Sequence, residues 1–154
     1  MMQYKAQDIL DANVNPVTGL ATDYLNLFNE AIMLFEMGLD MPDMAEELMN
    51  WHRRDYVEHF EHSGFELKDV VISAYYHAPT EIRAAFDEVC NRALTVFESS
   101  IEILLSSNPE DDAARADLTG RLQDMQALVL EMDSHIHGRA QAAKCAQSEV
   151  DALF

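Results

Sequence analysis

Residues that would point to several common protein classes are scarce in this sequence: 154 residues contain two cysteines, five glycines and four prolines. Cys90 and Cys145 have neither CxxC nor zinc-type spacing, so we expect buried free thiols in a reducing compartment, without a disulfide framework. So few glycines and prolines exclude a turn-rich β-sandwich or barrel. No apolar run reaches the length of a membrane span, so we expect no membrane association through a spanning helix.

Basic residues are also rare, because ten Lys and Arg stand against 28 Asp and Glu, which gives a formal net charge of −18. The interval between Lys5 and Arg53 has no basic residue. Such a surface repels nucleic-acid phosphates and anionic lipid, so we expect neither as a partner. Basic proteins and cations remain candidate partners; alternatively, the charge only keeps the protein soluble. The acidic residues in that interval are Asp8, Asp11, Asp23, Glu30, Glu36, Asp40, Asp43, Glu46 and Glu47.

Apolar residues make up 49% of the chain, which excludes a disordered protein, and the length fits one domain over 1–154. The chain does not open with a basic segment followed by an apolar one, as a signal peptide would. We therefore expect a cytoplasmic protein.

The apolar residues recur at helical spacing almost throughout, which predicts an all-α protein. We expect a helical bundle with a four-helix core, a long antiparallel C-terminal hairpin and a helical tail. The short connection at Ser107-Asn108-Pro109 requires the two long helices beside it to fold back on each other. The predicted core helices span 18–37, 42–62, 80–106 and 109–137, with shorter helices at 3–12 and 66–77 and the tail at 139–154.

Two features predict a homodimer. Apolar residues of the 80–106 helix cover a wider arc than one core stripe needs, so this helix has a second face for a further helix or another subunit. The tail carries its own apolar face, which packs either across a dimer or on its own bundle. The residues of that tail face are Ala140, Ala143, Ala146, Val150, Leu153 and Phe154.

The densest group of ionisable residues lies at the end of the predicted 42–62 helix. If this helix is continuous, its apolar stripe through Leu48 and Trp51 runs directly into Asp55 and His59. These two polar residues would then be buried and within hydrogen-bonding reach of each other.

Three interpretations of this group follow. The first is a structural His–Asp pair that satisfies buried polar atoms. The second is a metal site for Zn, Fe, Mn or Ni, since imidazole and carboxylate suit these ions and helical bundles build such sites. The third is acid–base catalysis by a histidine that Asp55 orients. The candidate ligands are His52, Asp55, Glu58, His59 and His62, with Glu36, His135 and Asp133 from other helices.

No motif for phosphate binding, dinucleotide binding or a nucleophile elbow is present, and no Glu is followed three residues later by His. We therefore expect a non-enzymatic, acidic helical interaction or regulatory protein that works as a homodimer and needs no cofactor. A metal-binding helical bundle with a His/carboxylate site is the alternative.

Overall fold

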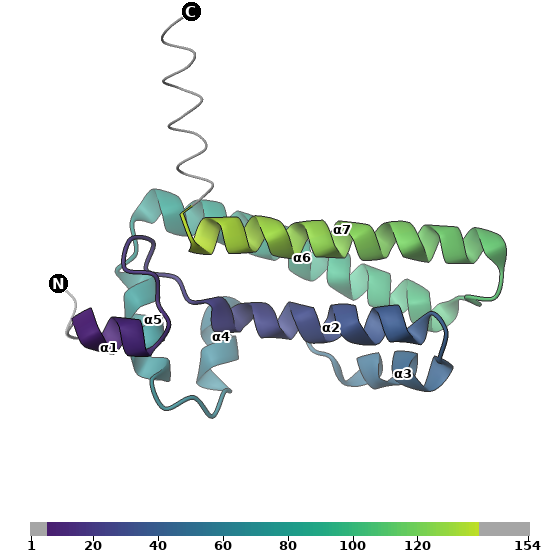
Figure 1. Cartoon of the computed structure of the whole chain (residues 1–154), viewed down its shortest axis with the longest axis horizontal. Coiled ribbons are helices and arrows are strands. Elements are labelled where there is room, and N and C mark those ends of the chain that lie inside the picture. Colours follow the sequence, from purple (N-terminus) through teal and green to yellow (C-terminus); the bar gives the residue numbers. More distant parts are fainter. Residues whose placement is uncertain (1–5, 139–154) are drawn as a thin grey trace, which may run out of the picture.

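The computed structural model of the chain describes residues 6–138 and is helical, with one isolated β-bridge between Val14 and Ala21 and no strand in that range (Figure 1). The all-α prediction is confirmed. The elements are α1 Ala6–Asp11, the 3-10 turn η1 Thr22–Tyr24, α2 Leu25–Gly38, α3 Pro42–Glu46, the 3-10 turn η2 Glu47–Asn50, α4 Tyr56–Glu61, α5 Lys68–Tyr76, α6 Thr80–Ser106 and α7 Asp112–Ile136.

The long helices α6 and α7 form the predicted antiparallel hairpin (Figure 1). The Asp111 side chain caps α7 by accepting a hydrogen bond from the N–H of Ala114 at 2.9 Å. This cap replaces Pro109 as the start of the helix, because a side-chain acceptor satisfies an N–H that would otherwise lack a partner. Helix α2 packs against both long helices and completes a body of three helices.

The core of this body consists of large apolar side chains from all three helices. The ring centroids of Phe28 in α2 and Phe97 in α6 lie 5.0 Å apart in an edge-on arrangement, and both residues are fully buried. Met125 and Met132 of α7 are fully buried as well. Burial of side chains of this size is the main source of stability in a domain of this length.

The wide apolar arc of α6 is covered within this chain, because α2 and α7 both pack against α6. Val89, Phe97 and Ile101 are buried, and Leu105 at the end of the arc is 40% exposed. This arc therefore does not by itself require a second subunit. The predicted tail at 139–154, its apolar face and Cys145 lie outside the described residues, whereas Cys90 is a buried free thiol.

The predicted continuous helix over 42–62 is wrong, and with it the expected fourth long member of the core. After α3 and η2 the chain becomes extended at Trp51, with φ −76° and ψ 126°, and helix resumes only at Tyr56. Side-chain hydrogen bonds hold the break: the Trp51 indole N–H donates to the Leu27 carbonyl at 2.9 Å, and the Tyr24 hydroxyl donates to the Arg54 carbonyl at 2.7 Å. The Tyr24 bond gives a carbonyl of the extended segment a partner outside a helix, and the Trp51 bond fixes the start of that segment to α2.

The predicted helix over 18–37 begins later than expected, at η1 and α2. Gly19 has φ +74°, and a Cβ there would lie 3.0 Å from the Ala74 carbonyl, so the chain enters α2 through a turn that favours glycine. The buried hydroxyl of Thr18 donates to the Ile136 carbonyl at 2.6 Å and ties this turn to the end of α7. Within residues 6–138, no helix combines the length and apolar character needed to cross a bilayer.

Candidate functional site

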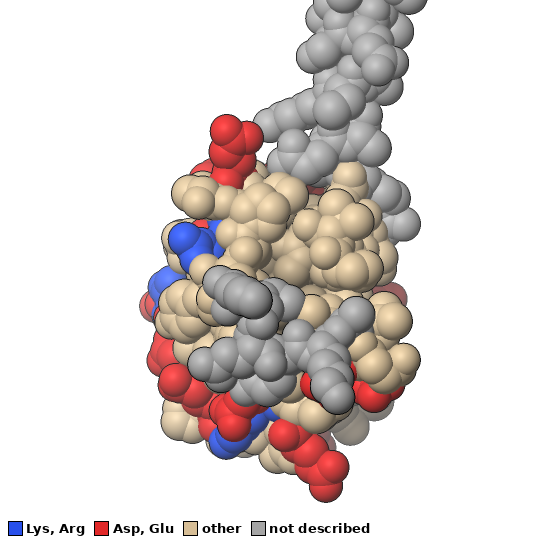
Figure 2. Space-filling model, turned by 90° about the vertical axis from the view of Figure 1, so that its left-hand side faces the viewer, with Lys and Arg blue, Asp and Glu red and all other residues tan. Residues whose placement is uncertain are grey.

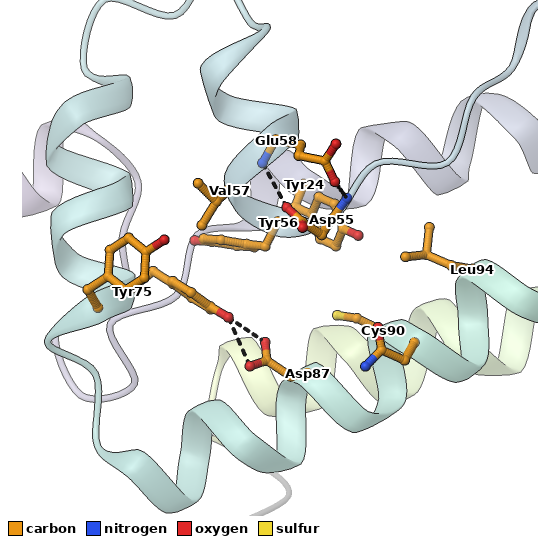
Figure 3. A pocket seen from close by; sticks show the side chains of 11 residues that line it. Tyr24, Asp55, Tyr56, Val57, Glu58, Tyr75, Asp87, Cys90 and Leu94 are labelled. Atoms are coloured by element: carbon orange, nitrogen blue, oxygen red, sulfur yellow. Dashed lines mark hydrogen bonds between the residues drawn. The ribbon is translucent and has the colours of Figure 1, made fainter.

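A cavity of about 380 Å³ opens between α4, the end of α5 and the first half of α6 (Figure 3). Its size falls in the range of small-molecule and side-chain binding pockets. We call it the tyrosine pocket, because Tyr24, Tyr56 and Tyr75 contribute to its wall, together with Asp55, Glu58, Asp87, Cys90 and Leu94.

The roof of the tyrosine pocket is the first turn of α4. Asp55 is the N-cap of this helix: its side chain accepts from the Glu58 N–H at 2.8 Å, and the Asp55 N–H donates to the Glu58 side chain at 3.2 Å. This reciprocal capping box fixes where α4 begins. It leaves both carboxylates exposed at the rim and turns the next residue, Tyr56, into the core, where it is 3% exposed.

Tyr75 and Asp87 join α5 to α6 across the pocket (Figure 3). The Tyr75 hydroxyl lies 2.8 Å from each of the two carboxylate oxygens of Asp87. Burial raises the pKa of the Asp87 carboxyl, while the hydrogen bond from Tyr75 and the charge of Arg83 oppose that rise. Burial, followed by the bond to Asp87, also raises the pKa of Tyr75, so Tyr75 keeps its proton at neutral pH.

The other two tyrosines form the back of the pocket. The Tyr56 ring stacks on Tyr75 at a centroid distance of 4.8 Å and meets the Tyr24 ring edge-on at 5.4 Å. Their hydroxyls bind the backbone, since Tyr56 accepts from the Ala21 N–H at 2.9 Å and Tyr24 donates to Arg54. Burial raises the pKa of both phenols. These hydroxyls are therefore neutral and engaged with the backbone.

Cys90 and Leu94 of α6 form an apolar floor, with exposed fractions of 5% and 2%. Burial, and then the charge of Asp87, raise the pKa of the Cys90 thiol. A protonated thiol is a poor nucleophile, so Cys90 contributes an apolar surface and not a reactive group.

The electrostatic character of the pocket is negative. Asp55, Glu58 and Asp87 reach it from two helices, and none of its lining residues is a lysine or arginine. The nearby Arg83 lies over the Tyr75 ring, with its guanidinium carbon 5.7 Å from the ring centroid. Three carboxylates beside an apolar floor can hold a cation that has an apolar stem.

The residues predicted from the sequence are only partly brought together. Asp55 and Glu58 lie at the pocket rim, but the expected buried pair of Asp55 and His59 is wrong, because Asp55 is an exposed helix cap. His59 is half-buried instead, and its Nε2 lies 3.0 Å from Asp23 Oδ2. The remaining candidates lie elsewhere: His52, His62 and Glu36 are exposed, and His135 and Asp133 are half-buried in the last turns of α7.

Over residues 6–138, no group of three or more His, Cys, Asp or Glu side chains is placed to hold a metal ion. The Zn, Fe, Mn or Ni alternative therefore remains a prediction from the sequence. Sequence reasoning missed Tyr75, Asp87 and Cys90 as neighbours in a site. The available signal was the spacing of Asp87, Cys90 and Leu94 by three and four residues, which places them along one face of a helix.

Comparisons of the chain with protein families, curated proteins and solved structures found no match. The pocket and the charge of the chain are therefore the starting points for a functional proposal.

Proposed function

We propose that this chain is a non-enzymatic helical interaction protein that binds a basic protein partner at the tyrosine pocket. The observation that carries the proposal is a cavity with three carboxylates and no lysine or arginine in its lining, in a chain of net charge −18. A partner's cationic side chain fits such a cavity, and the surrounding field speeds the encounter. The tyrosines and the thiol of the pocket are protonated and offer no activated nucleophile, which favours binding over nucleophilic catalysis.

The surface charge of the molecule supports the same proposal. On the face shown in Figure 2, acidic side chains cover a wider area than the few basic ones, which lie near its margin. Steering by such a surface is screened within about 8 Å at physiological salt, so contacts in the pocket must supply the specificity. The proposal therefore requires that the overall negative charge attract the basic partner and that the pocket carboxylates add affinity of their own.

A charge-matched pair of variants separates these two contributions. The pocket variant combines Asp55→Asn, Glu58→Gln and Asp87→Asn; asparagine and glutamine preserve the capping bonds of α4. The control variant combines Asp43→Asn, Glu46→Gln and Glu47→Gln, which are exposed residues of α3 and η2. Both remove the same charge, and α3 lies at the other end of α2 from α4 (Figure 1).

Binding is measured by fluorescence anisotropy with a labelled lysine-rich peptide at 0.15 M salt, and a glutamate-rich peptide serves as the negative probe. We expect the pocket variant to bind the lysine peptide about tenfold more weakly, a loss of about 1.4 kcal/mol, while the control changes much less. Equal losses in the two variants would show that only overall charge matters and would overturn the proposal.

The proposal includes a homodimer, and the exposed face of α7 is its interface. Ala116, Gly120, Gln123, Ala127 and Leu130 all lie on this face, are exposed, and are uncharged in a strongly acidic chain. Leu130 is 71% exposed, and a Cβ on Gly120 would meet nothing within 4 Å. Glycine inside an exposed helix costs about 1 kcal/mol relative to alanine, so a close approach by another helix would explain it.

The spacing of these residues alternates between four and three, as in a helix-pairing seam. In an antiparallel pair about a two-fold axis, Leu130 of one chain would lie opposite Gly120 of the other, so a large side chain meets an open position. Light scattering at micromolar concentration should give about twice the chain mass of 17.4 kDa.

Leu130→Glu should produce a monomer with unchanged helix content, because it places a charge at the position that packs opposite Gly120 of the other chain. Val17→Glu is the matched control, since Val17 is 72% exposed and lies outside α7. A wild-type monomer, or a dimer that survives Leu130→Glu, would refute this interface.

A further inference from the structure

Resting on the binding function proposed above, we propose that the tyrosine pocket recognises one primary alkylammonium group. The nitrogen binds the Asp87 carboxylate, and the exposed carboxylates of Asp55 and Glu58 at the rim add to the negative potential around it. The aliphatic stem lies along Cys90 and Leu94. A lysine side chain and a free aliphatic amine share this chemistry.

The state of Asp87 favours an ammonium ion over a guanidinium ion. A guanidinium group binds a carboxylate through two parallel hydrogen bonds, which require both oxygens on one edge. The Tyr75 hydroxyl lies 2.8 Å from both Asp87 oxygens and therefore occupies that edge. An ammonium ion is a compact charge that can bind a single carboxylate oxygen of Asp87 from outside that edge.

The shape of the cavity fits a stem with a charged end. About 380 Å³ accommodates a butyl chain and several water molecules. Leu94 and Cys90 are almost fully buried at the floor, whereas Asp55 and Glu58 are exposed at the rim. Long cationic side chains bury their methylene groups in this way while keeping the charge near water or carboxylates.

The placement of Asp87 also calls for a ligand. A carboxylate withdrawn from water, with a raised pKa, lowers the stability of the folded chain at neutral pH. The charges facing it are those of Asp55 on α4, which raises this pKa, and Arg83 on α6, which lowers it. A bound ammonium would favour the charged form of Asp87 and remove this cost.

The test uses three small probes with blocked ends: Nα-acetyl-lysine, Nα-acetyl-arginine and Nα-acetyl-norleucine, each as the N-methylamide. Two-dimensional amide NMR of the full chain follows the signals of the pocket residues during titration. We expect the lysine probe to shift the signals of Asp87, Cys90 and Leu94, the arginine probe to bind several-fold more weakly, and norleucine to leave them unchanged. Butylamine is added as a fourth probe: tighter binding of the lysine probe indicates a protein source, and tighter binding of butylamine indicates a free amine.

Two variants make the test specific. Asp87→Asn should abolish the lysine shifts, while the exposed control Asp43→Asn should leave them intact. Tyr75→Phe removes the hydroxyl that occupies the Asp87 oxygens, so it should raise the affinity of the arginine probe relative to the lysine probe. A merely structural role of Tyr75 would weaken both probes together and would overturn the argument from Asp87.

A second measurement uses the floor of the pocket. The methyl signals of Leu94 should shift when the lysine probe is added and stay constant with norleucine. Absence of both the amide and the methyl shifts would refute the alkylammonium site. If the lysine peptide still discriminated the charge-matched variants in that case, the proposed function would stand. NMR shifts at the pocket, together with equal losses of peptide affinity in the two charge-matched variants, would support the alkylammonium site and overturn the proposed function.

Discussion

Replacing Tyr56 with phenylalanine removes one oxygen atom from the interior, and we expect this small change to destabilise the protein by about 1–3 kcal/mol. The hydroxyl of Tyr56 accepts the N–H of Ala21, and Ala21 is fully buried. No solvent can replace the lost acceptor, so a buried donor would remain without a partner, which carries the full desolvation penalty.

The ring contacts of Tyr56 do not change in this variant. Its ring meets those of Tyr24, Phe60, Tyr75 and Phe86 at centroid distances between 4.8 and 5.6 Å, and phenylalanine preserves all four contacts. Phenylalanine also costs less to remove from water than tyrosine, and this difference offsets part of the desolvation penalty of the unpaired Ala21 N–H. The measured change therefore reports the single hydrogen bond to Ala21.

The assay is urea unfolding followed by circular dichroism, with Tyr24→Phe as the control. Tyr24 donates to the carbonyl of Arg54, a half-buried residue, so water can replace the lost donor and the expected loss is only about 0.5–1.5 kcal/mol. The slope of the free energy of unfolding against urea concentration should be the same in both variants. A loss below about 0.5 kcal/mol for Tyr56→Phe, or a larger loss for Tyr24→Phe, would refute the reasoning.

Substitutions at four further positions test other contacts by urea unfolding. Gly38→Ala should cost about 1–3 kcal/mol, because its Cβ would lie 2.8 Å from the Cβ of Ala45 between α2 and α3. Gly64→Ala, whose Cβ meets nothing within 4 Å, should change stability by no more than about 1 kcal/mol. Asp55→Ala should cost about 0.5–2 kcal/mol through loss of the α4 cap, and Asp55→Asn should retain that stability. Asp87→Asn should stabilise the protein at pH 7. Folding raises the pKa of the Asp87 carboxyl above its ordinary value of 3.8, so the carboxyl favours the folded state below that pH. This contribution to stability is lost as the pH rises through the folded-state pKa. This gain over the wild type should disappear near pH 3, and a gain that persists there would contradict the raised pKa.

The hairpin of α6 and α7 was predictable because local signals agree along its length. Apolar spacing, the short connection after Ser107 and the acidic residues at the start of α7 all indicate two helices that fold back. The start of α7 differs by only a few residues from the predicted start at 109, because Asp111 provides the cap. Elements on which several local signals agree can be predicted from one sequence.

The break between η2 and α4 was not predictable from periodicity, because Asp55 and His59 fall on the same helical face as Leu48 and Trp51 and no proline or glycine interrupts the segment. The decisive contacts come from distant residues: Leu27 and Tyr24 bind Trp51 and Arg54 through side-chain hydrogen bonds. One local signal was available, namely Asp55 followed three residues later by Glu58, which is the pattern of a capping box. This pattern indicates a new helix that starts at Tyr56, as an alternative to one continuous helix over 42–62.

The tyrosine pocket was missed for a related reason. Its members come from four separate elements, and of those members only Asp55 and Glu58 were among the candidate residues predicted from the sequence. Tyr75 and Asp87 are unremarkable residues of two helices until the fold brings the hydroxyl within 2.8 Å of the carboxylate. Tertiary proximity of this kind has no counterpart in the spacing of one sequence.

The break between η2 and α4 and the roof of the tyrosine pocket depend on the same contacts. In a continuous helix Asp55 would face the core and Tyr56 would turn away from it by about 100°. In the structure Tyr56 is buried and Asp55 lies at the rim, so the contacts that hold the break also set the pocket roof.

Tyr56→Phe should therefore weaken binding of the lysine peptide at a temperature where the variant is fully folded. Gly38→Ala, a comparable loss of stability at the other end of α2 from α4, should leave that binding unchanged (Figure 1). Fluorescence anisotropy measures both variants under the same conditions. Equal affinities for the two variants would mean that the extended segment at 51–55 stabilises the fold without shaping the site, because the pocket would then be insensitive to the contact between Tyr56 and Ala21.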